Sequence, residues 1–186
     1  MTAVVLAGGG SRRMGADKAL LDWHGRALVD HVADRIRPVC TRLLIASGDG
    51  RRLGRAGEIA DPLAEAGPLG GLLAALEAAD APLLAVVAVD LPHANAGVLG
   101  ALASVIGEGD AAIPLVDGRL QPLHAVFRTT GAERLRAYLD AGGRSVMGFL
   151  DQLTVAEAGP GVWSAADPTG RFAVNLNSPE DVTRER

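Results

Sequence analysis

The sequence predicts an open α/β fold with three layers, built on a mostly parallel β-sheet that contains one antiparallel strand. Two features of the sequence lead to this prediction. Short, uninterrupted apolar runs are typical of parallel strands covered on both faces, and here they alternate with stretches in which apolar residues recur at helical spacing. The length of 186 residues corresponds to about one domain, so we expect residues 1–186 to form a single domain.

The first half of the chain alternates regularly between the two kinds of segment. An apolar run over residues 3–7 is followed by a glycine-rich loop and then by a helical pattern over residues 29–36, which Pro38 ends. Further strands are expected at residues 43–46, 58–60 and 83–89, and further helices over residues 69–76 and 98–105. Such alternation is typical of a parallel sheet with crossover helices.

The second half is less regular. Two predicted strands, at residues 111–116 and 123–127, are separated by Asp117 and Gly118, a hairpin-type turn signal, so we expect one antiparallel pairing. Ser178, Pro179 and Asp181 form a capping box with proline at the first helical position, which predicts a helix near the C-terminus. The remaining elements are expected as helices at residues 135–139 and 146–153 and as a strand at residues 172–176.

Composition excludes several classes of protein. The net charge is −4, so the chain lacks the basic balance of a nonspecific nucleic-acid binder. Cys40 is the only cysteine, which excludes an intramolecular disulfide and a four-cysteine zinc site and favours a reducing cytoplasm. The apolar stretch at residues 81–89 is too short to cross a bilayer, and the first ten residues lack a signal-peptide pattern. We therefore expect a cytoplasmic protein that binds neither nucleic acid nor membranes.

The loop after the first strand has the composition of a phosphate-binding loop. Three glycines allow backbone amides to approach an anion, and basic residues, including Arg13 and Lys18, add positive charge. Lys18 is the only lysine among 18 basic residues. The spacing fits neither a Walker A loop, because Ala16 and Asp17 precede Lys18, nor the dinucleotide fingerprint, because Arg13 replaces a small residue. A tight turn without a ligand is the alternative.

Three more polar residues follow predicted strands. Ser47, Asp61 and Asp90 each lie just beyond the carboxyl end of a strand, and in open α/β sheets ligands bind at that edge. Asp90 could provide a carboxylate for Mg²⁺, whose other ligands are commonly phosphates and water, although aspartate before a helix is also a common N-cap. Asp61 before Pro62 could equally start a turn.

Other polar residues give weaker signals. Asn175 and Asn177 flank the end of the last predicted strand, where their amides could hold a substrate, although asparagine is also an ordinary turn residue. Arg144 follows two glycines and could bind a phosphate, although an exposed, solvated arginine is the default. The four histidines show no spacing typical of metal ligands.

Residues 6–15, Leu-Ala-Gly-Gly-Gly-Ser-Arg-Arg-Met-Gly, followed by Asp17 and Lys18, resemble the signature of the molybdenum cofactor guanylyltransferase family. The similarity spans nearly the whole chain. It continues through Asp61 and through residues 67–72, 89–92, 121–123, 143–147 and 175–179. This resemblance implies a Rossmann-like nucleotidyltransferase fold and an Mg²⁺-dependent transfer of GMP from GTP to molybdopterin, with release of pyrophosphate.

The resemblance also implies roles for individual residues. Lys18, Arg13 and Asp90 are expected to carry catalysis, and Asp90 to bind Mg²⁺. GTP binding is expected at Leu6, Ala7, Gly8, Gly9, Gly10, Ser11, Lys18, Ser47, Asp61 and Asp90. The pterin side is expected at Arg144, Asn175 and Asn177. Possible further partners are other cofactor-biosynthesis or acceptor proteins.

Two alternatives remain open at the level of sequence. Gly9 matches the guanine-selective form of the loop. Ser47-Gly48, however, stands where related sequences tend to carry asparagine, so a cytidylyltransferase or another small-molecule phosphate nucleotidyltransferase is the first alternative. A nucleotide-binding module without catalysis is the second alternative, because few side chains have a catalytic character. Phosphoryl-type transfer, however, needs positioning and charge neutralisation more than a covalent nucleophile.

Overall fold

A computed structural model describes residues 1–8, 17–48, 52–63 and 66–186. Within them, an eight-stranded sheet has the order β10-β7-β9-β6-β1-β4-β5, with β8 paired to β7. Its strands are β1 (Thr2–Leu6), β4 (Arg42–Ala46), β5 (Glu58–Ile59), β6 (Leu83–Ala88), β7 (Ala111–Val116), β8 (Arg119–Leu120), β9 (His124–Arg128) and β10 (Val155–Ala158). A separate hairpin consists of β2 (Asp22–Trp23) and β3 (Arg26–Ala27).

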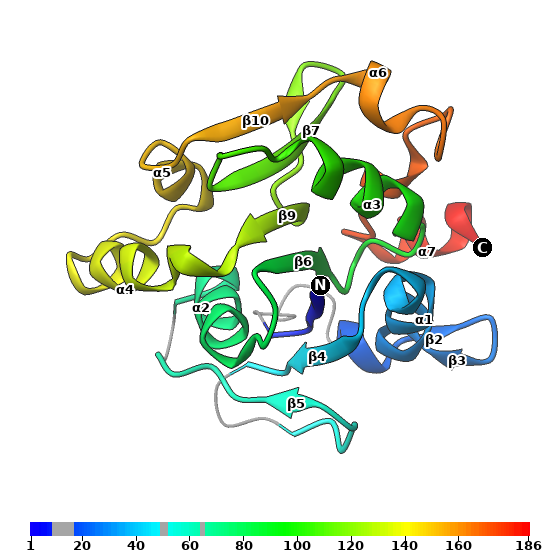
Figure 1. Cartoon of the computed structure of the whole chain (residues 1–186). Coiled ribbons are helices and arrows are strands. Elements are labelled where there is room, and N and C mark those ends of the chain that lie inside the picture. Colours follow the sequence, from blue (N-terminus) through cyan, green and yellow to red (C-terminus); the bar gives the residue numbers. More distant parts are fainter. Residues whose placement is uncertain (9–16, 49–51, 64–65) are drawn as a thin grey trace.

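Helices cover both faces of the sheet, which gives three layers (Figure 1). Helices α1 (Leu28–Ile36) and α3 (Ala96–Val105) cover one face, and α2 (Pro68–Ala78), α4 (Ala132–Asp140) and α5 (Val146–Leu150) cover the other. The remaining helices are α6 (Pro160–Trp163), α7 (Pro179–Glu185) and the 3-10 turns η2 (Lys18–Leu20), η3 (Arg37–Val39), η4 (Thr129–Gly131) and η5 (Arg171–Ala173).

Strand β1 lies at the centre of the sheet and contributes to both cores. It pairs in parallel with β4 and β6, so that Val4 lies opposite Leu44 and Val86. Because side chains alternate along a strand, Val5 packs into the core beneath α1 and α3, whereas Val4 packs into the core beneath α2 and α4. Burial on both faces explains why this strand has no polar alternation in the sequence.

Strand β9 is the antiparallel strand of the main sheet. It lies between β6 and β7 and pairs antiparallel with both, while β10 pairs in parallel with β7. The predicted α/β class with a mostly parallel sheet is therefore confirmed, and the short strand β8 adds a second antiparallel strand by pairing with β7. The turn prediction needs a correction, because Asp117 and Gly118, both with positive φ, join β7 to the short strand β8 rather than directly to β9.

The predicted strand at residues 172–176 is wrong. Gly170 adopts φ +68°, and the chain then forms the 3-10 turn η5 instead of entering the sheet. The backbone N–H of Leu176 donates instead to the carbonyl of Asp90, at 2.9 Å. Phe172 and Leu176 are buried where the chain crosses the end of β6, and their burial explains why the sequence shows the apolar pattern of a strand. Residues 172–176 are called the strap below.

Smaller differences concern short elements. The helix expected at residues 146–153 ends at Leu150. Strands β8 and β10, the β2–β3 hairpin and helix α6 were not predicted, because two to four residues are too few for a periodic pattern. The capping box is confirmed: the Ser178 side chain accepts from Asp181 N–H, and the Asp181 carboxylate accepts from Ser178 N–H.

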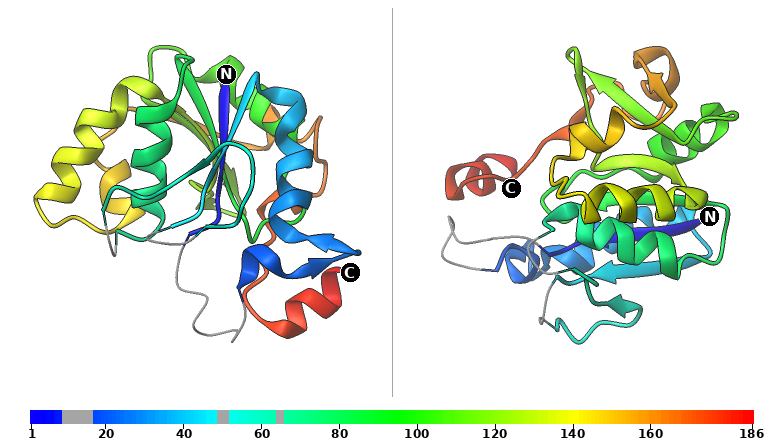
Figure 2. Two further views of the ribbon diagram at one scale, coloured as in Figure 1. Left: turned by 90° about the horizontal axis from the view of Figure 1, so that it is seen from below. Right: turned by 90° about the vertical axis from the view of Figure 1, so that its left-hand side faces the viewer.

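Two further views show which elements lie near the carboxyl ends of the parallel strands. In both, the carboxyl ends of β1, β4 and β6 lie on the same side of the molecule as η2 and α7 (Figure 2). In the described part of the chain, no helix has the length and hydrophobicity needed to cross a membrane.

Candidate functional site

The ends of β1 and β4 come into backbone contact at the carboxyl edge of the sheet. The N–H groups of Ala7 and Gly8 both donate to the carbonyl of Ala46, at 2.8 and 2.9 Å. A Cβ atom at Gly8 would lie 2.6 Å from the Cα of Gly48, which is closer than such atoms approach. Only glycine therefore fits at position 8, and the first strand ends directly against the Ser47-Gly48 segment.

Ser47 is buried and bonds to the end of β5. Its backbone N–H and its hydroxyl both donate to the Ile59 carbonyl, at 3.2 and 3.5 Å. Ser47 thus ties the end of β4 to the end of β5, and its neighbour Gly48 presents backbone at the contact with Gly8.

Glu58 holds residues 53–55, the segment that leads into β5. Its carboxylate accepts the backbone N–H groups of Leu53, Gly54 and Arg55, at 2.5, 2.9 and 3.4 Å. The bond from Leu53 is the main reason why the pKa of Glu58 lies below its ordinary value. Glu58 was not predicted as a functional residue, because its partners are set by the fold of the loop.

Asp61 lies against the first turn of α2. A Cβ atom at Gly70 would be 3.2 Å from Asp61 Oδ2, and one at Gly71 would be 3.4 Å from Oδ1. The same position at Gly71 is 3.1 Å from the side chains of Leu6 and Ala46. The two glycines thus allow the N-terminal turn of α2 to pack closely against Asp61 and the ends of β1 and β4. Helix N-termini carry partial positive charge, which suits a phosphate or a carboxylate.

Lys18 and Asp90 form an ion pair at the same edge. The distance between Lys18 Nζ and Asp90 Oδ2 is 3.3 Å, and their side chains are 20% and 24% exposed. Lys18 begins the 3-10 turn η2, which the Asp17 side chain caps by accepting the N–H of Ala19 at 3.0 Å. Partial exposure leaves both charges accessible to a ligand that approaches this edge.

The segment between Asp90 and α3 is held by helix α1. His31 Nε2 donates to the Pro92 carbonyl at 2.8 Å, and Arg35 Nε donates to the Ala94 carbonyl at 2.6 Å. Burial lowers the pKa of His31, although its bond to Pro92 opposes the shift. His31 and Arg35 were missed as site residues, and their spacing of four on one helix face is the signal that could have found them.

The two asparagines lie beside Asp90. They flank Leu176, whose N–H donates to the Asp90 carbonyl. The side-chain amide of Asn175 donates to the Ala173 carbonyl at 3.1 Å, and the backbone N–H of Asn177 donates to Asp181 Oδ2 at 2.9 Å. Asn175 and Asn177 thus follow no strand, and their contact with a substrate stays a prediction.

Arg144 lies elsewhere, at the C-terminal end of α4. It is exposed, and its Nη1 donates to the carbonyls of Leu139 and Gly143, at 2.8 and 2.7 Å. The bond to Leu139 ties Arg144 to the last turn of α4, whose carbonyl at Leu139 also accepts the N–H of Gly142. Contact of Arg144 with a ligand stays a prediction. Gly9, Gly10, Ser11 and Arg13 lie outside the described residues.

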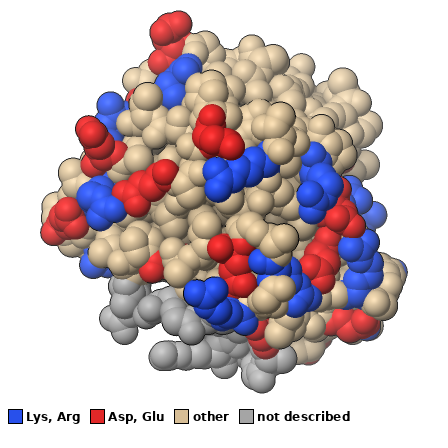
Figure 3. All heavy atoms as spheres, turned by 60° about the horizontal axis from the view of Figure 1, so that its bottom comes forward, with Lys and Arg blue, Asp and Glu red and all other residues tan. Residues whose placement is uncertain are grey.

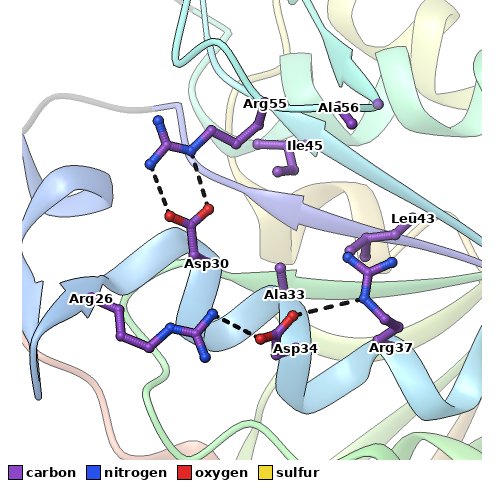
Figure 4. A pocket seen from close by; sticks show the side chains of 10 residues that line it. Arg26, Asp30, Ala33, Asp34, Arg37, Leu43, Ile45, Arg55 and Ala56 are labelled. Carbon is purple, nitrogen blue, oxygen red and sulfur yellow. Dashed lines mark hydrogen bonds and ion pairs between the residues drawn. The ribbon is translucent and has the colours of Figure 1, made fainter.

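A hollow of about 390 Å³ lies between α1 and the β4–β5 end of the sheet (Figure 4). Arg55 makes two bonds to the Asp30 carboxylate, at 3.1 and 2.8 Å, and Asp34 pairs with Arg26 at 2.7 Å and Arg37 at 3.7 Å. Its bonds with Arg55 hold the pKa of Asp30 below its ordinary value. Three arginines thus pair with two aspartates in this hollow, and the pair of Arg55 with Asp30 fastens the Arg55 segment to α1.

Charge on the surrounding surface is mixed. On the face shown in Figure 3, lysine and arginine side chains alternate with aspartate and glutamate and do not gather in one basic patch. No group of three or more histidine, cysteine or acidic side chains with the arrangement of a metal site occurs among the described residues.

Comparison with known proteins agrees with this geometry. Residues 3–155 match the MobA-like NTP transferase domain, which covers most of the chain. The chain belongs to this family. The predicted relationship to molybdenum cofactor guanylyltransferases is confirmed by relatives that carry this name.

Relatives in the MobA-like family are similar over nearly their full length. A protein of Cereibacter sphaeroides named molybdenum cofactor guanylyltransferase is 38% identical over 187 residues, covering 97% of this chain and 93% of the relative. A protein of Chloroflexus aggregans, named probable molybdenum cofactor guanylyltransferase, is 35% identical over 190 residues, covering 98% and 91%.

Solved structures show the same fold. The crystal structure of molybdopterin-guanine dinucleotide biosynthesis protein A from Archaeoglobus fulgidus has a TM-score of 0.86 and 26% identity, covering 99% of this chain and 96% of that one. A 2-C-methyl-D-erythritol 4-phosphate cytidylyltransferase from Thermus thermophilus, at 19% identity and a TM-score of 0.70 over 97% and 95% of the two chains, shares the fold alone.

Proposed function

We propose that this MobA-like nucleotidyltransferase transfers GMP from GTP to molybdopterin, releasing pyrophosphate and forming a molybdopterin guanine dinucleotide cofactor. The observation that carries the proposal is the 38% identity, over 97% of the chain, to a protein named molybdenum cofactor guanylyltransferase. The meeting of Lys18, Asp90 and the glycine-rich end of β1 at one edge of the sheet supports it.

In this proposal the GTP lies across the ends of β1, β4 and β5. Backbone at the close contact between Gly8 and Gly48 borders the nucleotide, and Asp61, which lies against the first turn of α2, faces it. The full set of proposed GTP-binding residues is Leu6, Ala7, Gly8, Gly9, Gly10, Ser11, Lys18, Ser47, Asp61 and Asp90. Ser47 is proposed to act by positioning the loop after β4, because its backbone N–H and its hydroxyl both donate to the Ile59 carbonyl.

Lys18 and Asp90, together with Arg13 of the glycine-rich loop, are proposed to stabilise the charges of the triphosphate and its metal ion during the reaction. The compact ammonium of Lys18 fits between phosphate oxygens, and its 3.3 Å contact with Asp90 keeps it at the edge where the triphosphate would lie. Such placement stabilises charge that develops on the phosphates as pyrophosphate leaves.

The donor set fits Mg²⁺. Asp90 offers a partly exposed carboxylate, the hard oxygen ligand that Mg²⁺ prefers, and the remaining ligands would be phosphate oxygens and water. When bound, Mg²⁺ would neutralise charge on the triphosphate. Leu176 bonds to the Asp90 carbonyl, and His31 and Arg35 of α1 fix the segment that follows, so that the Asp90 carboxylate is held in place before any ligand binds.

Molybdopterin is assigned to the side of the site formed by Asn175 and Asn177, with Arg144 as a further candidate at the end of α4. The two asparagines are supported by their position next to Asp90. We also propose that residues 1–186 act as one domain in the cytoplasm, and that acceptor or cofactor-biosynthesis proteins exchange the pterin with it.

The test is product analysis with purified protein, molybdopterin, Mg²⁺ and either GTP or CTP. We expect pyrophosphate release with GTP only when molybdopterin is present, together with a guanine dinucleotide product of the corresponding mass. Preferential use of CTP would move the assignment to cytidylyl transfer. Nucleotide binding without pyrophosphate release would contradict catalysis and favour a binding module.

A further inference from the structure

His124 is a buried polar residue for which the proposed chemistry has no use. It is fully buried on β9, opposite Val87 of β6, and it is one of three polar residues buried among those that the structure describes, with Thr2 and Ser47. Buried polar groups are normally hydrogen-bonded, so the partners of this imidazole indicate why it is there.

One imidazole nitrogen of His124 is engaged and the other is not. The backbone N–H of Asn95 donates to Nε2 at 3.0 Å, which places the ring proton on Nδ1. Nδ1 has no hydrogen-bond partner in the described part of the chain. Burial lowers the pKa of His124 to about 4, so the ring is neutral near pH 7. An apolar side chain would avoid the cost of the unpaired N–H, so the acceptor at Nε2 is the feature that the histidine adds.

His124 contacts the two segments that border Asp90. The first runs from Asp90 to Asn95, whose backbone N–H donates to Nε2 and whose side chain caps α3 by accepting the N–H groups of Gly97 and Val98. The second is the strap that begins at Phe172, whose ring centroid lies 4.8 Å from that of His124. That strap donates from Leu176 to the Asp90 carbonyl.

We propose that His124 is a positioning residue that sets the metal affinity of Asp90 from inside the core. By accepting from Asn95 and packing against Phe172, it fixes the far ends of both segments that hold the Asp90 backbone, and thereby the direction of its carboxylate. The inference rests on the proposed function, in which Asp90 binds the divalent cation of a nucleotide complex.

The test compares variants of matched size. His124→Met removes the acceptor at similar volume, whereas His124→Gln offers an amide oxygen near the place of Nε2. Phe127→Leu on the same strand, whose side chain packs in the other core, serves as the control for general loss of packing. Binding of Mn²⁺ in the presence of GTP is followed by the loss of the free-ion signal in electron paramagnetic resonance, and binding of GTP is measured separately in EDTA.

We expect His124→Met to weaken Mn²⁺ binding about tenfold, equivalent to about 1.4 kcal/mol, while GTP binding in EDTA stays within about twofold of wild type. His124→Gln should recover most of the loss, and Phe127→Leu should lower the thermal midpoint without changing the affinity for Mn²⁺. The same affinity in His124→Met and wild type, or an equal loss in Phe127→Leu, would overturn the role of His124.

The outcome is separable from that of the proposed function. If the wild-type protein binds Mn²⁺ and GTP but forms no dinucleotide from molybdopterin, the proposed reaction fails while the comparison of metal affinities still decides the role of His124. Should His124→Met not fold, His124→Gln and Phe172→Leu carry the test, because Phe172→Leu removes the ring contact and keeps the bond from Asn95. Phe172→Leu is then expected to weaken Mn²⁺ binding while His124→Gln stays near wild type, and unchanged affinity in Phe172→Leu would contradict the proposal.

Discussion

Lys18 Nζ lies 3.3 Å from Asp90 Oδ2, although 72 positions separate the two residues in the sequence. The chain's only lysine thus forms an ion pair with the carboxylate that follows strand β6. A pair of opposite charges at this edge can accept both partners of a metal–phosphate complex, since the ammonium attracts phosphate and the carboxylate attracts the cation. The first predictions concern this pair.

Lys18→Ala and Asp90→Ala should each reduce nucleotidyl transfer by at least about 100-fold, because each removes charge stabilisation that the reaction needs. Lys18→Arg should restore little, since a planar guanidinium does not replace a compact ammonium between phosphate oxygens. The pair is partly exposed, so unfolding in urea should change by less than about 1 kcal/mol in any of the three variants. Near-normal turnover in either alanine variant would remove the proposed mechanism.

Nucleotide selectivity should be visible without the pterin. At about 100 times its dissociation constant, a ligand adds about 2.7 kcal/mol of stability, which for a chain of this size raises the thermal midpoint by about 5–10 °C. We expect this shift with GTP, a larger one with Mg²⁺ present, and none of the Mg²⁺ effect in Asp90→Ala. A shift selective for CTP would contradict the choice of base.

Gly8→Ala should damage the site through the backbone contact with Gly48, where the added Cβ would lie 2.6 Å from the Cα. We expect a loss of about 1–3 kcal/mol in unfolding free energy and weaker GTP binding, because the end of β1 must move away from β4. Gly159→Ala is the matched control, since a Cβ there meets no atom within 4 Å. Equal effects of the two substitutions on calorimetric stability would show that the contact is unimportant.

Acid should destabilise the protein through His124. Its pKa is about 4 in the folded chain against 6.5 for the ordinary side chain, so the unfolded state binds more protons between these values. This contribution to stability is therefore complete above pH 6.5 and is lost as the pH falls toward 4, by about 3 kcal/mol in total. The free energy of unfolding, measured in urea, should fall between pH 7 and pH 4 in wild type. In His124→Met it should fall by about 3 kcal/mol less. Parallel losses in the two proteins would contradict the shift.

Much of the fold could be predicted because its central strands are covered on both faces. Burial on both sides makes β1, β4 and β6 continuous apolar runs, and helices α1 and α2 show the matching helical spacing. The strap at residues 172–176 was mistaken for a strand because Phe172 and Leu176 are buried for a different reason, against the end of β6. Apolar spacing reports burial, and it cannot say whether a backbone pairs in a sheet.

The candidate site likewise contains residues that could be predicted from the sequence and residues that could not. Lys18, Asp61 and Asp90 could be predicted because each follows a recognisable strand or loop, and the fold places all three at the carboxyl edge. Glu58, His31 and Arg35 act on backbone groups, Glu58 within its own loop and His31 and Arg35 across distant segments, and such contacts leave no local pattern in the sequence. The contact of Arg144 with the last turn of α4 likewise depends on how the chain turns after the helix.

The antiparallel direction of β9 has a consequence for how such an enzyme can change over evolution. Since β9 runs against β6 and β7, the connection that enters it, residues 117–123, crosses the edge where Asp90 lies, while β1 and β4 form the opposite half of the sheet. Insertions or substitutions in that connection can reshape the half of the edge that holds Asp90, beside which the acceptor is proposed to bind, and leave the Gly8–Gly48 contact untouched. Under the proposed placement, a change of acceptor molecule is therefore accessible by small steps, each of which preserves nucleotide binding.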